Sequence, residues 1–299
     1  MRATPLHPRR LGLIGIGLLG SALAERLLRA GFELTGFDVA PERREAFGRA
    51  GGEVAAGGAA VLARCARVLL SLPSHVEVEA VLRECAGELR AGQTVIDTST
   101  GDPAAAERLA AELAPRGVTY LDATVSGSSA QVRAGTAVLM VGGDAAGFSA
   151  CADLFASLGA ETHHTGGPGT GAKMKLATNV VLGLNRAALA EGLALAGALG
   201  LDPAQALAIM RQGPAYSRIM DGKGGKMLAG DFSPEARLSQ HLKDVRLILE
   251  QARAAGLALP LSSVHRTVLE AAEAAGFGAQ DNSAIFEVLR RKATGALPP

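Results

Sequence analysis

The first half of the chain alternates short apolar runs with longer amphipathic stretches. Glycine, aspartate, serine or proline follows each apolar run, which is typical of strands that end in turns. The predicted strands are residues 11–15, 34–37, 68–72, 94–97, 119–122 and 137–141. The predicted helices between them are residues 21–30, 75–88, 104–114 and 146–158. Strands that are apolar throughout, separated by helices, indicate a parallel-rich, doubly wound sheet covered on both faces.

The strand pattern stops after about residue 166. Residues 172–199 are apolar on nearly every side, which predicts one long helix that is buried. The further predicted helices are residues 203–212, 235–255, 261–275 and 282–291. We therefore expect an α/β domain over residues 1–166 and an all-α domain over residues 167–299, joined by the long helix.

Composition and charge exclude several classes of function. The 30 lysines and arginines balance 29 acidic residues, so the net charge of +1 provides no electrostatic footprint for nucleic acid. No uncharged apolar run reaches the roughly 18 residues of a membrane span, and the polar N-terminus does not resemble a secretory leader. The three cysteines have no metal-binding spacing. We expect a cytoplasmic protein that binds neither membranes nor nucleic acid.

A glycine-rich loop lies between the first predicted strand and the first predicted helix. Gly15 permits the tight turn, Gly17 lets the backbone approach a pyrophosphate, and Gly20 lets helix and strand pack closely. The start of the following helix then faces the negative charge. This order of strand, loop and helix predicts a Rossmann dinucleotide site. Its loop residues are Gly15, Ile16, Gly17, Leu18, Leu19 and Gly20.

An acidic residue ends the second predicted strand. Asp38 can accept hydrogen bonds from the adenosine ribose hydroxyls, and its charge repels a 2′-phosphate. We therefore expect NAD as the cofactor. NADP stays possible because Arg43 and Arg44 follow closely. The alternative is a tight turn with an ordinary surface aspartate.

Two more strand ends are candidates for cofactor contacts. Ligands of open α/β sheets bind beyond the carboxyl ends of the strands. Leu72 and Pro73 end the third predicted strand, and Thr100 follows the fourth. The alternative is local turn chemistry, with Thr100 or Asp102 capping the helix that starts at Pro103.

A second glycine-rich segment begins the long helix. Lys175 and Asn179 lie four residues apart and share a helix face, whereas Lys173 lies roughly 200° around the helix from Lys175. The helix start and desolvation both lower the pKa of a lysine, which suits a general base at neutral pH. The alternative is a structural salt bridge or a lysine whose amine reaches solvent.

Small residues follow the fifth predicted strand. The backbone of Ser126, Gly127 and Ser128 can expose N–H groups as a nest that holds a carboxylate. The alternative is a simple small-residue turn. Late in the chain, Lys243 and Asp244 lie in a helical pattern, and Lys243 by itself is typical of a solvated charge.

Taken together, these segments resemble the β-hydroxyacid dehydrogenase family, which includes 3-hydroxyisobutyrate dehydrogenases and 2-hydroxy-3-oxopropionate reductases. The family's cofactor loop resembles residues 15–20, and its substrate motif Asp-Ala-Pro-Val-Ser-Gly-Gly resembles residues 122–128. Its catalytic motif Gly-x-x-Gly-x-Gly-x-x-x-Lys-x-x-x-Asn resembles residues 166–179. Its late Lys-Asp pair resembles residues 243–244, which follow Asp-Phe-Ser-Pro at residues 231–234.

The resemblance implies a role for each candidate residue. Lys175 would be the general acid/base and Asn179 would orient the substrate. The substrate carboxylate would bind at Ser126, Gly127 and Ser128. The remaining cofactor contacts would be Leu72, Pro73, Thr100 and Lys243, of which Lys243 would close over the site.

The reaction implied by the resemblance moves a hydride between NAD and the carbinol carbon of a small β-hydroxy acid. No metal is required, because the cofactor carries the redox chemistry. The resemblance also implies a homodimer or a homotetramer.

Three departures from the family pattern bear on specificity. Thr124 replaces the usual proline, Ser128 replaces a glycine, and Thr178 stands where many members have asparagine. We expect Thr124 and Ser128 to select an acid other than 3-hydroxyisobutyrate.

Three alternative functions are open. A 6-phosphogluconate dehydrogenase-like enzyme would have histidine at the position of Thr178. An imine reductase would lack the lysine found here at residue 175. A non-catalytic NAD(P)-binding module would also have lost that lysine.

Overall fold

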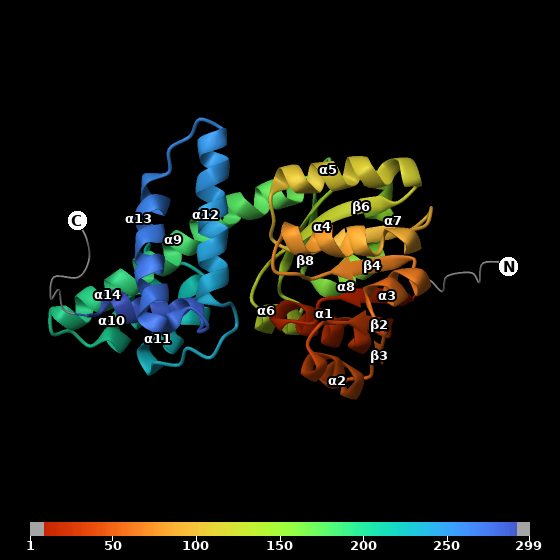
Figure 1. Ribbon diagram of the computed structural model, residues 1–299. Coiled ribbons are helices and arrows are strands. Elements are labelled where there is room, and N and C mark those ends of the chain that lie inside the picture. The colour runs from red at the N-terminus through yellow and green to blue at the C-terminus, as the bar shows by residue number, and fades with distance from the viewer. Residues whose placement is uncertain (1–8, 292–299) are drawn as a thin grey trace. The chain divides into compact units, whose positions relative to one another are not determined.

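The computed structural model describes residues 9–291. The chain divides into two compact units, Met1–Lys175 and Leu176–Pro299 (Figure 1). The sequence prediction placed the boundary after residue 166, whereas the structure places it inside α9 (Thr170–Ala198). The difference arises because the first turn of α9 packs closely on the sheet of the first unit.

The first unit is built on an eight-stranded sheet in the order β3-β2-β1-β4-β5-β6-β7-β8. Neighbouring strands run parallel except β6 and β7, which are antiparallel. This confirms the predicted parallel-rich, doubly wound sheet. The strands are β1 (Arg10–Ile14), β2 (Glu33–Phe37), β3 (Glu53–Val54), β4 (Arg67–Leu70), β5 (Thr94–Asp97), β6 (Thr119–Ser126), β7 (Val138–Gly142) and β8 (Glu161–Gly166).

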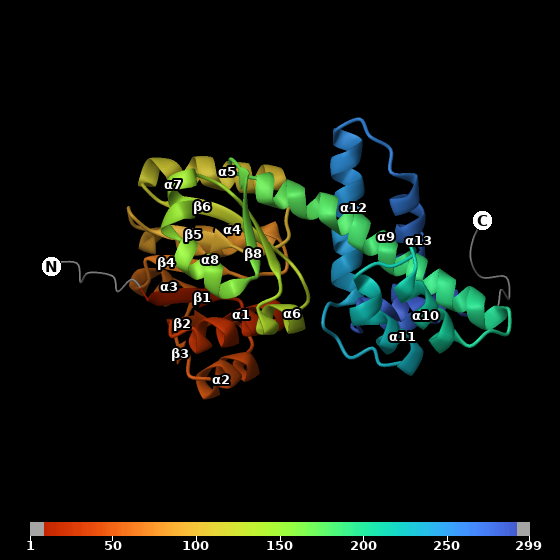
Figure 2. The same ribbon diagram turned by 180° about the vertical axis from the view of Figure 1, so that it is seen from behind.

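Helices cover both faces of the sheet (Figures 1 and 2). One face packs against α1 (Leu18–Arg29), α6 (Ser129–Ala134) and α8 (Ala152–Leu158), with α7 (Ala145–Ala150) beside them. The other face packs against α3 (Gly58–Arg64), α4 (His75–Glu84) and α5 (Pro103–Leu113). Successive strand residues enter opposite cores: Leu69 packs in the first and Leu70 in the second. Both faces are therefore buried, which explains why the strands are apolar throughout.

Several elements of the first unit escaped the sequence prediction because they bury little apolar surface. β8, Glu-Thr-His-His-Thr-Gly, is an edge strand whose residues are exposed or half-buried. β3 is two exposed residues long. α2 (Pro41–Arg49) buries only Phe47 among nine residues. Periodicity cannot reveal such elements, since it records only repeated burial of one face. The short turns η1 (Ala86–Glu88) and η2 (Ala114–Arg116) complete this unit.

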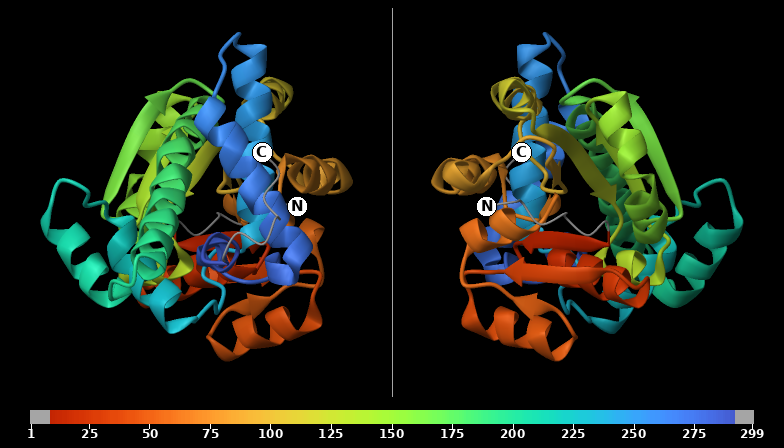
Figure 3. Two further views of the ribbon diagram at one scale, coloured as in Figure 1. Left: turned by 90° about the vertical axis from the view of Figure 1, so that its left-hand side faces the viewer. Right: turned by 90° about the vertical axis from the view of Figure 1, so that its right-hand side faces the viewer.

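The regular elements of the second unit, in the part that the structure describes, are helices joined by loops. Its core packs α9 residues with apolar residues of α12 (Leu238–Ala254) and α13 (Pro260–Ala272), two helices that are in contact, lie side by side in Figure 1 and overlap in the views of Figure 3. The predicted helix over residues 235–255 begins only at Leu238, and the one over residues 282–291 is a tight turn followed by a short helix. The elements are α10 (Pro203–Gln212), η3 (Met220–Gly224), α11 (Gly225–Ala229), α12 (Leu238–Ala254), α13 (Pro260–Ala272), η4 (Glu273–Phe277), η5 (Asn282–Ala284) and α14 (Ile285–Leu289).

The long helix α9 is less buried than predicted. Only 33% of its most apolar 18-residue stretch is buried, and Val181 and Leu195 are exposed. The prediction of a wholly buried helix is therefore wrong for this chain. An apolar composition allows a helix to be buried, but the extent of burial depends on which other segments pack against it. By length and composition α9 could also cross a membrane, a property that core helices of water-soluble proteins share.

A buried ion cluster ties together three segments of the helical unit. Asp281 is fully buried, and its carboxylate lies 2.9 Å from Lys223 Nζ. It also accepts hydrogen bonds from the hydroxyl of Ser283 at 2.7 Å and from the backbone N–H of Glu235 at 3.0 Å. Burial alone raises the pKa of Asp281, but the charge and hydrogen bonds of Lys223 outweigh it and hold that pKa below its usual value.

Candidate active site

The candidate site of the first unit lies at the carboxyl edge of its sheet. β1, β2, β4, β5 and β6 run parallel to their neighbours in this group, so the loops that follow them lie at one edge. The structure therefore brings most of the predicted cofactor and substrate segments to that edge. These segments are the glycine loop, Asp38, Leu72 with Pro73, Thr100, and Ser126 with Gly127 and Ser128.

The glycines of the cofactor loop serve different purposes. Gly15 has a φ of +93°, and a Cβ there would collide with the carbonyl oxygen of Ser71. A Cβ on Gly20 would collide with the carbonyl oxygen of Gly15. Gly17 is different, because the nearest atom to its Cβ position is Arg43 Nη1 at 3.9 Å. The fold requires Gly15 and Gly20, whereas the space over Gly17 is open to a ligand.

The start of α1 suits an anionic ligand. Its N-cap, Gly17, has no side chain to cap the helix, and the first turn contains no acidic residue. The first N–H groups of a helix have no acceptor within the helix, and the helix dipole places positive potential there. The glycine loop and this helix end together fit a pyrophosphate.

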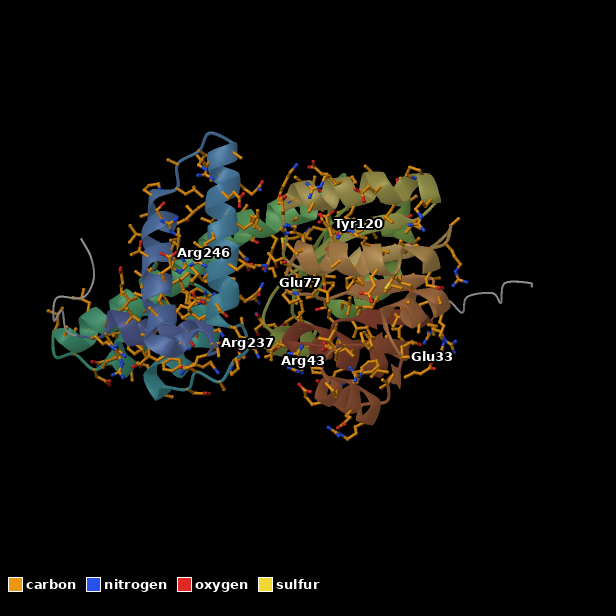
Figure 4. The ribbon with its side chains drawn as sticks, viewed as in Figure 1. Glu33, Arg43, Glu77, Tyr120, Arg237 and Arg246 are labelled. Carbon is orange, nitrogen blue, oxygen red and sulfur yellow. The ribbon has the colours of Figure 1, made fainter. Side chains whose placement is uncertain are left out.

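The carboxylate of Asp38 is buried against the same loop. It accepts hydrogen bonds from the backbone N–H of Ile16 at 2.6 Å and of Ala40 at 2.9 Å. Arg43, labelled in Figure 4, forms an ion pair with it at 3.3 Å. Arg44 donates to the carbonyl oxygen of Asp38 at 2.7 Å. The end of β2 therefore presents one carboxylate flanked by two guanidinium groups.

We expect Gly17→Ala to lower the affinity for NAD by roughly tenfold or more, because the new methyl group occupies the space that a pyrophosphate needs. The fold should tolerate the change, since nothing lies closer than 3.9 Å to that position. Calorimetric titration with NAD measures the affinity, and thermal unfolding reports on the fold. Gly87→Ala is the control, because its Cβ has no neighbour within 4 Å. Unchanged NAD binding by Gly17→Ala would remove this glycine from the cofactor site.

The loop after β4 contacts the glycine loop. A Cβ on Gly15 would lie 2.9 Å from Leu72 Cδ2, so the Leu72 side chain packs beside the cofactor loop. The backbone N–H of Leu72 donates to Ser99 Oγ at 3.0 Å, which joins this loop to the one after β5. Pro73 precedes Ser74, whose hydroxyl caps α4. Ser99 therefore uses its hydroxyl oxygen within the protein, as the acceptor that joins the two loops.

Buried polar groups hold the loop after β5. Asp97 accepts hydrogen bonds from the hydroxyl of Tyr120 at 2.7 Å and from the N–H of Ser99 at 2.8 Å (Tyr120 is labelled in Figure 4). Burial raises the pKa of both Asp97 and Tyr120. Asp102 caps α5 by accepting from the N–H of Ala104, so Thr100 is not the helix cap. Thr100 lies in the chain between Ser99 and Asp102, in the loop at this carboxyl edge.

Lys175 lies at the end of β6. It is 8% exposed, and its Nζ donates to the carbonyl oxygen of Val125 at 2.6 Å. Lys173, two residues earlier, instead forms an exposed ion pair with Glu107 at 2.7 Å. The two lysines of the second glycine-rich segment therefore have different surroundings, and only Lys175 is buried beside the predicted substrate segment.

Asp122 anchors the helix that carries Lys175, a role that sequence reasoning missed. Its carboxylate accepts hydrogen bonds from the N–H of Gly169 at 2.9 Å and of Ala172 at 2.8 Å. Burial raises the pKa of Asp122, and these backbone N–H groups oppose that rise. The start of α9 has no acidic residue of its own. An uncapped glycine-rich helix start, paired with an aspartate at a strand end, is the signal that could have indicated this contact.

The segment after β6 is only partly the nest that the sequence predicts. Gly127 has a φ of +155°, and a Cβ there would lie 3.1 Å from Ala137 Cβ, so this turn favours glycine. Ser128 is the N-cap of α6. Its backbone N–H donates to Gln131 Oε1 at 2.9 Å and is already used within the protein. The amide of Ser128 is therefore not part of an open nest, and its hydroxyl oxygen accepts from the N–H of Gln131 at 3.3 Å.

In the helical unit, the other predicted residues form a short polar chain. Asn179 Nδ2 donates to Asp244 Oδ2 at 3.3 Å, and both side chains are buried. Lys243 Nζ lies 3.3 Å from Asp244 Oδ1. Asp244 thus contacts both residues that the sequence singled out in this unit.

Comparison with known proteins gives the family. Residues 10–166 match the model of the NAD binding domain of 6-phosphogluconate dehydrogenase, and residues 169–289 match the NAD-binding model of NADP-dependent 3-hydroxyisobutyrate dehydrogenase. The chain is 32% identical to L-threonate dehydrogenase of Cupriavidus necator over 94% of this chain and 96% of that protein. The chain belongs to the β-hydroxyacid dehydrogenase family.

Two solved structures share the fold of this chain over most of its length. The 3-hydroxyisobutyrate dehydrogenase of Salmonella typhimurium superposes with a TM-score of 0.86 at 26% identity, over 93% of this chain and 99% of that one. Psf3 in complex with NADP+ and 2-OPP superposes with a TM-score of 0.84 at 25% identity, over 93% and 99%. This β-hydroxyacid dehydrogenase is thus an NAD(P)-dependent oxidoreductase of small hydroxy acids.

Proposed function

We propose that Lys175 is the general acid/base of this β-hydroxyacid dehydrogenase. The observation that carries the proposal is its buried amine beside the end of β6, at the sheet edge where the cofactor loop also lies. A lysine amine can take up and return a proton, which is the role of a general acid/base. A nicotinamide cofactor held at the glycine loop would supply the hydride chemistry at the carbinol carbon. Lys175 Nζ takes the hydroxyl proton in oxidation and returns it in reduction.

The remaining residues bind and orient the acid in this proposal. Ser126, Gly127 and the hydroxyl of Ser128 lie at the turn after β6 and would hold the substrate carboxylate. Asn179 lies one helical turn after Lys175 and would orient the carbinol. Its amide is held by Asp244, which also contacts Lys243, the residue proposed to close over the cofactor.

We propose that the substrate is a small β-hydroxy acid more polar than 3-hydroxyisobutyrate, as L-threonate is. Ser128 supports this proposal, because its hydroxyl could form a hydrogen bond with a polar substrate at a position where the family motif has glycine. Initial rates of NAD reduction with 3-hydroxyisobutyrate, glycerate, 3-hydroxypropionate, 4-hydroxybutyrate and threonate test the proposal. Faster turnover of threonate or glycerate would support it. A clear preference for 3-hydroxyisobutyrate would reject the polar substrate and keep the reaction class.

We propose that the enzyme prefers NAD to NADP, because the buried carboxylate of Asp38 would repel a 2′-phosphate. Asp38→Asn removes the charge but keeps an oxygen that can accept from Ile16 N–H. The variant should lower the ratio of kcat/KM for NAD over NADP by about tenfold or more, since a charged hydrogen bond is lost and Arg43 is freed for phosphate. Steady-state rates with both cofactors measure the ratio. An unchanged ratio would mean that Asp38 does not select the cofactor.

We also propose a cytoplasmic homodimer or homotetramer. Apolar side chains on three helices of the second unit are exposed, and a second copy of the chain would cover such surface. The exposed residues include Val181, Leu195, Ile209, Leu261 and Val264. Light scattering of the purified enzyme gives the number of subunits.

A further inference from the structure

The first turn of α9 lies directly against the backbone of β6 and β7. A Cβ on Gly171 would collide with the carbonyl oxygen of Asp122 and lie 2.7 Å from that of Met140. A Cβ on Gly142 would lie 2.7 Å from the amide nitrogen of Gly171. The start of the helix is therefore in backbone contact with both strands, one turn before Lys175.

Thr124 of β6 lies where the start of α9 meets β6 and β7. Its side chain is 1% exposed, and its Oγ1 lies 3.0 Å from the carbonyl oxygen of Gly171 and 3.2 Å from that of Met140. A hydroxyl has one hydrogen, so it donates to one of these carbonyls at a time while remaining in contact with both. In an α-helix the carbonyl of residue 171 accepts the N–H of residue 175. Thr124 therefore contacts the same carbonyl oxygen that accepts the backbone N–H of Lys175.

Neighbouring residues of β6 hold the rest of this turn. Asp122 binds the N–H groups of Gly169 and Ala172, and Val125 accepts the amine of Lys175 through its carbonyl oxygen. Residues 122–125 of β6 therefore contact the start of α9, the backbone carbonyl of Gly171 and the amine of Lys175.

We propose that Thr124 is a positioning residue that sets the location of Lys175 Nζ through the first turn of α9. The proposal rests on the proposed function of Lys175. Proline, the usual residue of the family motif at this position, has no hydroxyl and cannot make this contact. The expectation that Thr124 selects the substrate is replaced, because its buried hydroxyl is turned to two backbone carbonyls.

Loss of the hydroxyl should act on turnover more than on binding. Without the hydroxyl of Thr124, the carbonyl oxygen of Gly171 would lose a hydrogen-bond donor. Gly171 has no side chain of its own that could hold this turn of α9 in place. Proton transfer depends on the position of the base to within a fraction of an ångström, and a misplacement of about 1 Å can lower a rate roughly 10²-fold. A partial displacement in the Thr124→Val enzyme should therefore lower kcat by about tenfold.

Thr124→Val and Thr124→Ser separate the hydroxyl from the packing. Valine keeps the shape without the hydroxyl, and serine keeps the hydroxyl with less bulk. With the fastest acid of the panel above, we expect Thr124→Val to lower kcat about tenfold, with KM for acid and NAD within about twofold. The pH profile of kcat should also shift, and Thr124→Ser should stay within about threefold of the wild type. Equal losses in both variants, at equal thermal stability, would show a packing role and overturn the proposal.

A double variant distinguishes this proposal from that of Lys175 itself. If Thr124 acts through the lysine, Thr124→Val should cause no further loss in a Lys175→Ala enzyme. A further loss there would overturn the positioning role, whereas near-normal turnover of Lys175→Ala alone would overturn the proposed function. Reductive methylation of Lys175, followed by peptide mass spectrometry across pH, gives a readout without substrate. We expect its rate to change at least about threefold in Thr124→Val, and an unchanged rate would contradict the proposal.

Discussion

Lys175→Ala should lower turnover by about 10²-fold or more while NAD still binds, since that is the usual effect of losing a general acid/base. The lysine lies on α9 and donates to Val125 of β6, and β4 and β5 separate β6 from β1, which leads into the proposed cofactor loop. The loss should therefore appear in kcat and kcat/KM for the acid rather than in the affinity for NAD. Steady-state kinetics and calorimetric titration with NAD measure the two quantities separately.

Lys173→Ala is the matched control for this experiment. It removes the same side chain two residues away on the same helix, where the amine is exposed and paired with Glu107. Exposed ion pairs contribute at most about 1 kcal/mol, so activity and stability should stay close to those of the wild type. Near-normal turnover of Lys175→Ala, or an equal loss in Lys173→Ala, would reject Lys175 as the acid/base.

Asp281→Ala should lower the free energy of unfolding of the helical unit by about 3–5 kcal/mol, the usual result of removing one partner of a buried ion pair. The substitution would leave the amine of Lys223 buried, with Glu235 at 3.0 Å as its remaining acidic partner among residues 9–291. It would also remove the acceptor for Ser283 and for the backbone N–H of Glu235. Denaturant unfolding followed by circular dichroism measures the change.

Asp231→Ala is the control for this loss. Its carboxylate is exposed and lies 3.4 Å from Lys226, so its removal should lower stability much less than Asp281→Ala does. If the two variants unfold at the same denaturant concentration, the buried cluster does not hold the three segments together. The m-value should be compared as well, because a change in it would indicate that the two units no longer unfold as before.

The parts of the site that are local in the chain could be predicted from the sequence. The glycine loop depends on residues within one turn between a strand and a helix, and Asp38 follows at the end of the next strand. The two lysines of α9 could also be separated by helical periodicity alone. The fold class followed from the alternation of apolar runs and helices, because both faces of a parallel sheet are buried.

Contacts between distant segments could not be predicted. Asp122 binds backbone N–H groups 47 and 50 residues later, and Thr124 bonds a carbonyl 47 residues away. No periodicity links residues at such separations, because each pairing exists only once the strand and the helix have packed. The polar edge strand β8 was missed for a related reason, since it is held by hydrogen bonds to β7 rather than by burial of its side chains.

The sequence by itself determined which chemistry this protein carries: a dinucleotide loop, an acidic strand end, a helix with Lys175 and Asn179, and a family with a known reaction class. These follow from residue type and short spacing, which act through local backbone geometry. Only the tertiary structure decided how Lys175 is held, which donors of the turn after β6 are already used, and how much of α9 is covered. Those outcomes depend on which backbone and side-chain groups of distant segments come into contact in the fold. Burial and hydrogen bonding arise from such contacts and are not properties of any one segment.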